Sequence, residues 1–146
     1  KYKVLNPREV HARYEIMVET YNKTVNVEGQ LTVLMANRYV LPAALEYLKA
    51  VGQSVSAVKA AGSKTAEGKK LLAKMVKLTD EFKKRTDKLE ATLDHTSSST
   101  EKHAKHFRDA VVPAMMALRE TSDALESTIP HGMWPLATYR EMLFIK

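Results

Sequence analysis

The sequence contains no cysteine, few turn-forming residues and no long apolar run. Without cysteine, the 146-residue chain has no disulfide, no thiol nucleophile and no thiolate metal ligand. Its 5 Gly and 5 Pro are too few for a loop-rich all-β protein or a disordered chain. No apolar stretch approaches the roughly 20 residues that span a bilayer, and no secretory signal pattern is present. We therefore expect a single domain with no membrane partner, and a cytoplasmic location is compatible with the lack of cysteine.

Motifs for catalysis, cofactor binding or metal binding are also missing. The segment Gly62-Ser63-Lys64-Thr65 resembles part of a phosphate-binding loop, but it lacks the first glycine and a preceding strand. His103 and His106 are three residues apart on one helical face, yet no further ligand accompanies them, so a solvated face is favoured over a metal site. We expect no catalytic, cofactor-binding or metal-binding residue in this chain.

The net charge of +6 is concentrated in one segment. Residues 64–90 contain nine basic and five acidic side chains, and some pairs, such as Glu81 and Arg85, have helical i, i+4 spacing. Such a segment could bind nucleic acid or an anionic membrane. Because the acidic residues are interleaved and Phe82 is its sole aromatic residue, a solvated helix face is favoured, and we expect no nucleic-acid partner.

Helical periodicity dominates the sequence. Apolar residues recur at spacings of three and four, as on one face of a helix, and no segment shows sustained alternation with period two. The four apolar stripes are Val10, Tyr14, Met17 and Tyr21; Val27 to Val55 through Leu31, Leu34, Leu41, Leu45 and Leu48; Leu71 to Leu93 through Met75, Leu78, Phe82, Thr86 and Leu89; and Ala104 to Ile129 through Phe107, Val111, Met115, Leu118 and Leu125.

These stripes predict an all-α fold. We expect one helical domain over residues 1–146, a bundle of three to four long antiparallel helices joined by short loops. The predicted helices cover about 7–24, 26–61, 66–94 and 99–129, followed by an apolar tail at 130–146. The β-branched residues around Val25 leave open whether 7–61 is one helix or two, and Pro42 and Pro113 should kink their helices.

Residues at the predicted helix ends favour the same boundaries. Asn6 and Glu9 form a capping box around Pro7, and Ser98 with Glu101 forms a second one. Gly62 is expected to terminate a helix, after which Ser63 or Thr65 would cap the next.

The C-terminal tail is too apolar to extend freely into water, since chain ends are usually polar and frayed. It must dock, either on its own bundle or on a partner. The residues expected to form this docking surface are Trp134, Pro135, Leu136, Tyr139, Met142, Leu143, Phe144 and Ile145.

Four blocks of sequence resemble the C-terminal region of type III glutamine synthetases. They are Pro7-Arg8-Glu9 with Arg13-Tyr14-Glu15-Ile16, the segment 23–28 (Lys-Thr-Val-Asn-Val-Glu), the segment 108–115 (Arg-Asp-Ala-Val-Val-Pro-Ala-Met) and the segments 134–136 and 138–146 of the tail. The blocks follow the order of the family and span nearly the whole chain. The resemblance is specific at both ends and looser over 50–100.

The resemblance implies a parent enzyme that joins ammonia to glutamate using ATP and a divalent metal, Mg or Mn, and that assembles as a large homo-oligomer. It implies that the catalytic domain lies upstream, as the partner on which this region packs, and that no catalytic residue lies here. The chain begins at Lys1 rather than Met, as a fragment would. The alternative reading is a free-standing helical-bundle module for protein–protein interaction.

Overall fold

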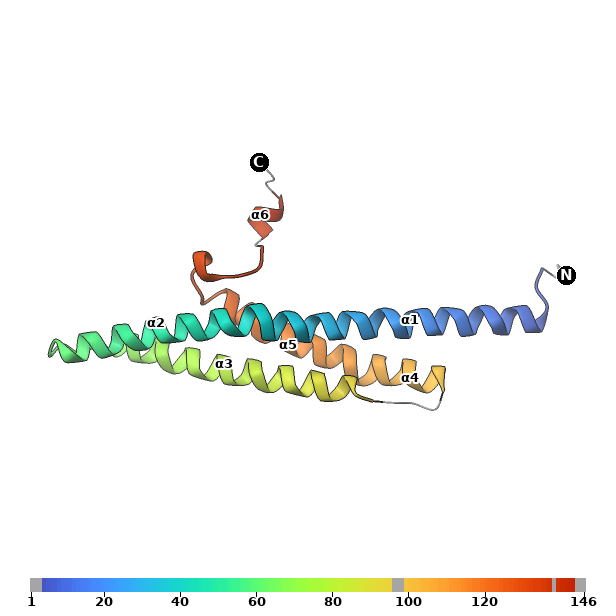
Figure 1. Cartoon of the computed structure of the whole chain (residues 1–146), viewed down its shortest axis with the longest axis horizontal. Helices are drawn as coiled ribbons and strands as arrows, with labels where there is room; N and C mark the ends of the chain where they lie inside the picture. The colour runs from blue at the N-terminus through green and yellow to red at the C-terminus, as the bar shows by residue number, and fades with distance from the viewer. Residues whose placement is uncertain (1–3, 96–98, 138, 144–146) are drawn as a thin grey trace.

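The computed structural model describes residues 4–95, 99–137 and 139–143. A continuous helical rod of 54 residues forms the long side of the molecule (Figure 1). It consists of α1 (Pro7–Met35), the π-helical turn η1 (Ala36–Val40) and α2 (Leu41–Ala60). The other elements are α3 (Ala66–Leu93), α4 (Thr100–His106), the π-helical turn η2 (Phe107–Val111), α5 (Val112–Glu126), the 3-10 turn η3 (His131–Met133) and α6 (Tyr139–Leu143).

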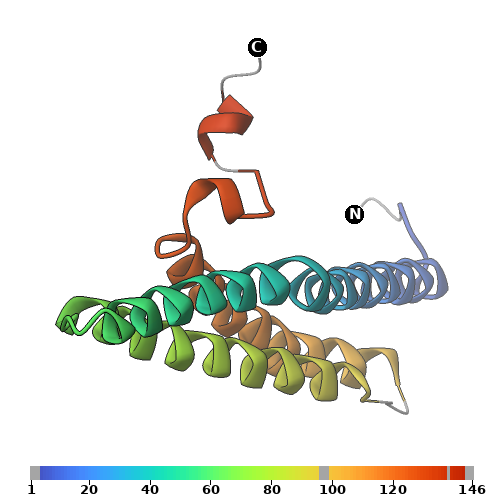
Figure 2. The same ribbon diagram turned by 60° about the vertical axis from the view of Figure 1, so that its left-hand side comes forward.

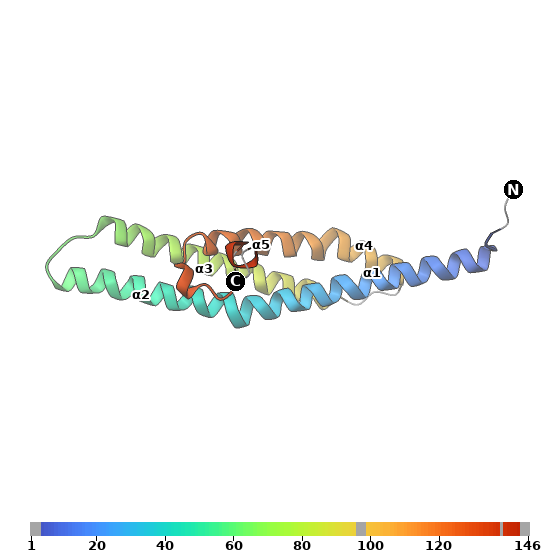
Figure 3. The same cartoon turned by 90° about the horizontal axis from the view of Figure 1, so that it is seen from above.

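The helices lie side by side as antiparallel neighbours (Figures 1 and 3). The chain reverses between α2 and α3, and again between α3 and α4, so that the long rod, α3 and the rod formed by α4, η2 and α5 pack against one another as three neighbours (Figure 2). No strand occurs within the described ranges. The predicted all-α bundle of long antiparallel helices with short loops is confirmed.

Side-chain caps and one glycine set the helix ends. The Asn6 side chain accepts a hydrogen bond from Glu9 N while Glu9 accepts one from Asn6 N, both at 2.8 Å, so the predicted capping box is present. Gly62 has a φ of 75°, which a side chain would disfavour, and Thr65 caps α3. The described cap of α4 is Ser99, whereas the predicted cap Ser98 lies outside the described residues.

Both prolines that were expected to kink a helix follow a π-helical turn. Pro42 follows η1 and Pro113 follows η2, each at the start of the next α-helix. Proline lacks an N–H and its ring clashes with the carbonyl four residues before it. A π-helical turn pairs residues five apart, as Leu41 N–H does with Ala36 O.

The core lies between the three rods and contains the stripes predicted for α3 and for α4–α5. Met75, Phe82 and Leu89 of α3 are fully buried, as are Val111 and Leu125 of the third rod. Leu71, Leu78, Leu93 and Met115 are partly buried against them. Periodicity therefore identified the packed faces of these two rods correctly.

The stripe predicted for the second helix is wrong as a buried face over most of its length, although Leu41 and Leu48 pack partly buried against the core. Leu31, Leu34 and Leu45 are exposed. The buried face of the long rod instead carries small or β-branched residues: Val25, Gly29, Val33, Ala36, Val40, Ala43, Ala44 and Val51. Small residues allow close approach of the neighbouring helix, since a Cβ atom on Gly29 would lie 2.7 Å from Leu93 Cδ2.

The long rod shows no boundary near residue 25. Its helix continues through 24–26, which settles the question of one helix or two in favour of a single helical rod. Val25 is buried against the bundle, and that burial outweighs the small helical cost of a β-branched side chain. The predicted helix 99–129 ends earlier, at Glu126, where the amides of Thr128 and Ile129 both bond Leu125 O in a closing turn.

Candidate interaction surfaces

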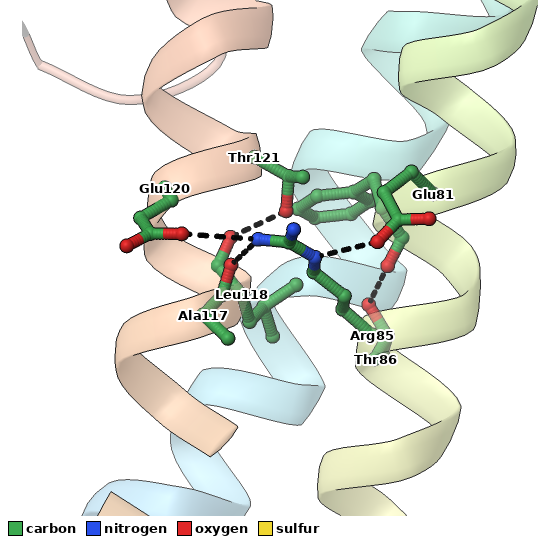
Figure 4. Close-up of polar contacts among 8 residues, drawn as sticks. Glu81, Arg85, Thr86, Ala117, Leu118, Glu120 and Thr121 are labelled. Atoms are coloured by element: carbon green, nitrogen blue, oxygen red, sulfur yellow. Dashed lines mark hydrogen bonds and ion pairs between the residues drawn. The ribbon is translucent and has the colours of Figure 1, made fainter. Parts of the chain in front are cut away.

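A polar cross-link joins α3 to α5 at Arg85 (Figure 4). Arg85 Nε donates to Glu81 Oε1 at 2.8 Å along α3, and Nη1 donates to the carbonyl of Ala117 and to Glu120 Oε2 on α5. The hydrogen bond from Arg85 lowers the pKa of Glu81 below its ordinary value. The ion pair predicted between Glu81 and Arg85 from their i, i+4 spacing is therefore present. Because Arg85 also bonds residues of α5, it links two rods of the bundle.

Three histidines gather where α3 meets α4. The rings of His95 and His106 stack with centroids 4.0 Å apart, and His103 stacks on Phe107 at 4.5 Å. His106 Nε2 lies 2.9 Å from Thr92 O, to which it donates. His103 and His106 thus have separate partners and are half-buried, so the favoured interpretation of a solvated face is wrong for them.

A shallow depression of about 710 Å³ borders this cluster, and His103, Asn22, Lys23 and Asp94 line part of it. The pKa of His103 is lowered below its usual value, mainly by burial and to a smaller extent by the neighbouring His106 and His95. Within the described residues, no three His, Asp or Glu side chains are placed to hold a metal ion. The depression lies between α1 and α4 and has a mixed lining, which also includes the apolar residues Leu93 and Phe107.

The basic segment forms an open face of α3. All eight lysines between residues 64 and 90 are exposed, and acidic neighbours pair with some of them, as Glu67 does with Lys70 at 2.7 Å. This placement supports the interpretation of a solvated helix face.

The predicted docking residues of the tail divide into two groups. Trp134 is 9% exposed within the core cluster, and Leu136 packs partly buried against it. Met142 and Leu143, by contrast, are exposed on α6, which stands off the bundle (Figures 1 and 2). Pro135 is exposed. The Tyr139 side chain, Phe144 and Ile145 lie outside the described residues, so docking of the whole tail is not confirmed.

An apolar groove of about 380 Å³ runs between the long rod and α5 and ends at Leu136. Met35 and Met116 are exposed at its edge, while Phe82 and Leu118 are buried beneath it. Methionine-rich walls adapt to varied apolar side chains. This groove was not predicted, because its walls come from segments that are far apart in the chain.

The N-terminal part of α1 is the most exposed apolar surface of the molecule's long rod. Val10, Tyr14, Met17 and Tyr21 share one face of the helix, and all four are exposed. The expectation that this stripe is buried within the bundle is therefore wrong for the described structure, because α4 reaches only its C-terminal end, where Lys105 and Arg108 lie near Tyr14 and Tyr21 without burying them (Figures 1 and 3).

None of the helices in the described ranges has the length and apolar character needed to cross a membrane.

Comparison with known proteins finds one matching family model and several similar enzymes. A family model described as "Glutamine synthetase C-terminal domain" matches residues 1–59. The type-3 glutamine synthetase of Dictyostelium discoideum is 27% identical over 151 aligned positions, which cover 98% of this chain and 20% of the relative. The chain is thus similar to the C-terminal domain of glutamine synthetases over residues 1–59, and to these enzymes along nearly its whole length.

Two bacterial glutamine synthetases match this chain with similar identity and coverage. The glutamine synthetase of Bacteroides fragilis is 27% identical, and that of Butyrivibrio fibrisolvens is 26% identical. Each match covers 99% of this chain and 21% of the relative. The chain thus spans about one fifth of the length of the curated relatives it matches, and the resemblance read from its sequence blocks is confirmed.

Proposed function

We propose that this chain is a structural and assembly domain of a glutamine synthetase, with its catalytic centre outside this region. The observation that carries the proposal is the match along nearly the whole chain to about one fifth of enzymes named glutamine synthetases. The parent enzyme would join ammonia to glutamate using ATP and a divalent metal, Mg or Mn. We derive no catalytic step from the helices described above.

The proposed partner is the catalytic domain of the same enzyme, in a cytoplasmic homo-oligomer. The tail supports this assignment through its division into two parts. Trp134 and Leu136 fasten the start of the tail to the bundle, while Met142 and Leu143 remain exposed beyond it. We propose that the distal tail, including Tyr139, Phe144 and Ile145, contacts the catalytic domain, because exposed clusters of large apolar side chains mark interaction sites.

The direct test measures glutamine formation from ammonia, glutamate and ATP by the isolated 146-residue chain. We expect no activity above a blank. Glutamine formation by this chain alone would refute the proposal.

A second measurement tests the assembly role in the full-length enzyme that carries this region. We expect deletion of the region to reduce the assembled species in sedimentation, whereas the intact enzyme sediments as an oligomer. Unchanged assembly and activity after deletion would contradict the structural role, and a stable complex between this chain and an unrelated helical protein would favour the free-standing interaction module.

A further inference from the structure

The N-terminal end of α1 extends past the bundle, and α4 approaches only the end of this segment near Tyr21 (Figures 1 and 3). Within residues 4–21 no residue is buried, and the first buried side chain is that of Asn22. Val10, Tyr14, Met17 and Tyr21, which we term the overhang face, are 52%, 51%, 72% and 39% exposed. Residues 7–21 make up about 22 Å of helix at 1.5 Å per residue.

A helix of this length gains little stability by itself. Isolated helices shorter than about 12–15 residues are marginal in water, and helices in proteins derive most of their stability from packing an apolar face. The capping box at Asn6 and the continuity with the packed part of α1 hold the overhang in helical form. Its apolar face nevertheless remains in contact with water, so its four large side chains gain only part of the burial energy that a partner would supply.

The composition of the overhang face is typical of a protein interface. Tyrosine and methionine are enriched at interface centres, where charged residues are depleted. The overhang face contains two tyrosines, a methionine and a valine, while charged residues such as Glu15, Glu19 and Lys23 lie on the other side of the helix.

The size of the face favours a covalently linked partner over a second copy of the chain. Tyrosine side chains bury roughly 150–250 Å² each when fully covered, but the four side chains here are only 39–72% exposed, so they offer about half of that area, whereas a stable complex of free proteins buries about 800 Å² on each partner. A partner within the same polypeptide is held at a high effective concentration, so a smaller contact suffices.

The comparisons place such a partner in the relatives. The glutamine synthetase C-terminal family model matches residues 1–59, which include the whole of α1 and its overhang. The curated relatives are about five times as long as the matched region. The additional four fifths of those chains provide a partner at fixed stoichiometry.

We propose that the overhang face of α1 packs against an apolar surface on the preceding, catalytic part of its parent glutamine synthetase. The inference rests on the proposed function, which it extends by assigning a second contact that is separate from the C-terminal tail. The two contacts lie at different places on the molecule, because α6 leaves the bundle near the junction of α1 and α2 while the overhang projects from its far end (Figure 1).

The test uses two variants, each with a single introduced cysteine on one side of the overhang. The chain has no cysteine of its own, so each variant contains one thiol in this region. Met17→Cys reports on the overhang face, and Ala12→Cys is the matched control on the other side of the same helix. Both positions are exposed. The labelling rate of each introduced thiol by a maleimide is followed by site-resolved mass spectrometry, in the 146-residue chain and in the full-length enzyme that carries it.

We expect the two thiols to react at similar rates in the isolated chain. In the full-length enzyme the Met17→Cys thiol should react at about one tenth of its rate in the isolated chain, or more slowly still. A tenfold decrease corresponds to protection of roughly 1.4 kcal/mol. The Ala12→Cys thiol should react as fast as in the isolated chain. Equal rates in the full-length enzyme would overturn the proposal. Protection already present in the isolated chain, together with a dimer in sedimentation, would also overturn it in favour of a second copy.

The outcomes separate this inference from the proposed function. If the full-length enzyme makes glutamine and depends on this region for assembly but leaves Met17→Cys reactive, only the overhang contact is wrong. If the region is dispensable for assembly, the structural role itself fails whatever the labelling shows.

Discussion

Leu89 and Leu31 show how differently the same residue type is used in this bundle. Both stand on apolar stripes that the sequence marks as helical faces. Leu89 is 0% exposed in the core between α3 and its neighbours, whereas Leu31 is 51% exposed on the outer side of α1. Hydrophobicity and spacing are alike at the two positions, so the difference lies in which neighbour approaches each face.

Leu89→Ala should lower the free energy of unfolding by about 2–5 kcal/mol, because it removes buried contacts and leaves a cavity. Leu31→Ala should change it by less than about 0.5 kcal/mol in the isolated chain, as surface substitutions usually do. Urea unfolding followed by circular dichroism measures both variants. Equal losses would show that the outer face of α1 is packed even in the isolated chain.

His103 gives the domain a pH-dependent contribution to stability. Its pKa is lowered in the folded state by burial and by the nearby His106 and His95, so the folded state binds fewer protons than the unfolded state. The favourable contribution is complete above the unfolded pKa of about 6.5 and is lost as the pH falls through the lower folded value.

The melting temperature should therefore fall as the pH is lowered from about 7.5 towards 5. His103→Gln, which does not titrate, should flatten this part of the profile relative to the unsubstituted chain. The lowered pKa of Glu81 and of Asp109 affects a lower range, below about 4.5, and is left unchanged by the substitution. An unaltered slope between pH 7.5 and 5 in the His103 variant would show that His103 does not contribute.

At the scale of elements, the tail behaves as two segments with different attachments. Residues 129–136 pack on the bundle through Ile129, Trp134 and Leu136, whereas α6 presents Met142 and Leu143 to solvent. The apolar composition of the whole tail indicated docking. It did not indicate how much of the tail its own bundle could accommodate.

Removal of residues 138–146 should leave the stability of the isolated domain unchanged, because the exposed side chains of α6 contribute little burial. Trp134→Ala should lower the free energy of unfolding by about 3 kcal/mol or more through the cavity it creates. The emission of Trp134, the sole tryptophan, follows unfolding in the truncated chain. A large loss of stability on truncation would show that the distal tail packs on the bundle.

The π-helical turns η1 and η2 illustrate how an element accommodates a local conflict. Each precedes a proline, and in each the pairing five residues back continues the rod where an α-helical pairing would be lost. Both turns contribute fully packed residues, Val40 from η1 and Val111 from η2. The proline positions were visible in the sequence, whereas the π-helical turn before each of them was not predicted.

At the scale of the whole molecule, the long rod sets the shape. At 1.5 Å per residue, its 54 residues extend about 81 Å. A compact domain of this length would have a radius of gyration of about 15 Å. We expect small-angle scattering of the monomer to give a clearly larger value, above about 20 Å, because a rod of about 81 Å dominates the mass distribution. A value near 15 Å would show that the overhang folds back onto the bundle.

An extended shape of this kind suits a domain that makes contacts at several places along a larger enzyme. The overhang of α1 and the distal tail each present large apolar side chains away from the core. In the relatives, the corresponding region is about one fifth of the chain. The isolated region thus shows more apolar surface than it can bury by itself.

Local chemistry in the sequence determined the helices, their ends and two of the packed faces. Asn6 with Glu9, Gly62 and Thr65 fix boundaries through hydrogen bonds and backbone conformation within a few residues, which a single sequence displays. The stripes of α3 and of α4–α5 were correct because each of these rods has one dominant apolar face. The family resemblance likewise followed from the sequence blocks.

Only the tertiary structure decided which side of the long rod is buried. α1 and α2 carry two apolar faces, and periodicity favoured the one with the larger residues, including Leu31, Leu34 and Leu45. The bundle buries the other, because small residues such as Gly29, Ala36 and Ala44 allow the neighbouring helices to approach closely. The stacked histidines, the reach of Arg85 to α5 and the groove ending at Leu136 join residues far apart in the chain, so they depend on the same choice of neighbours.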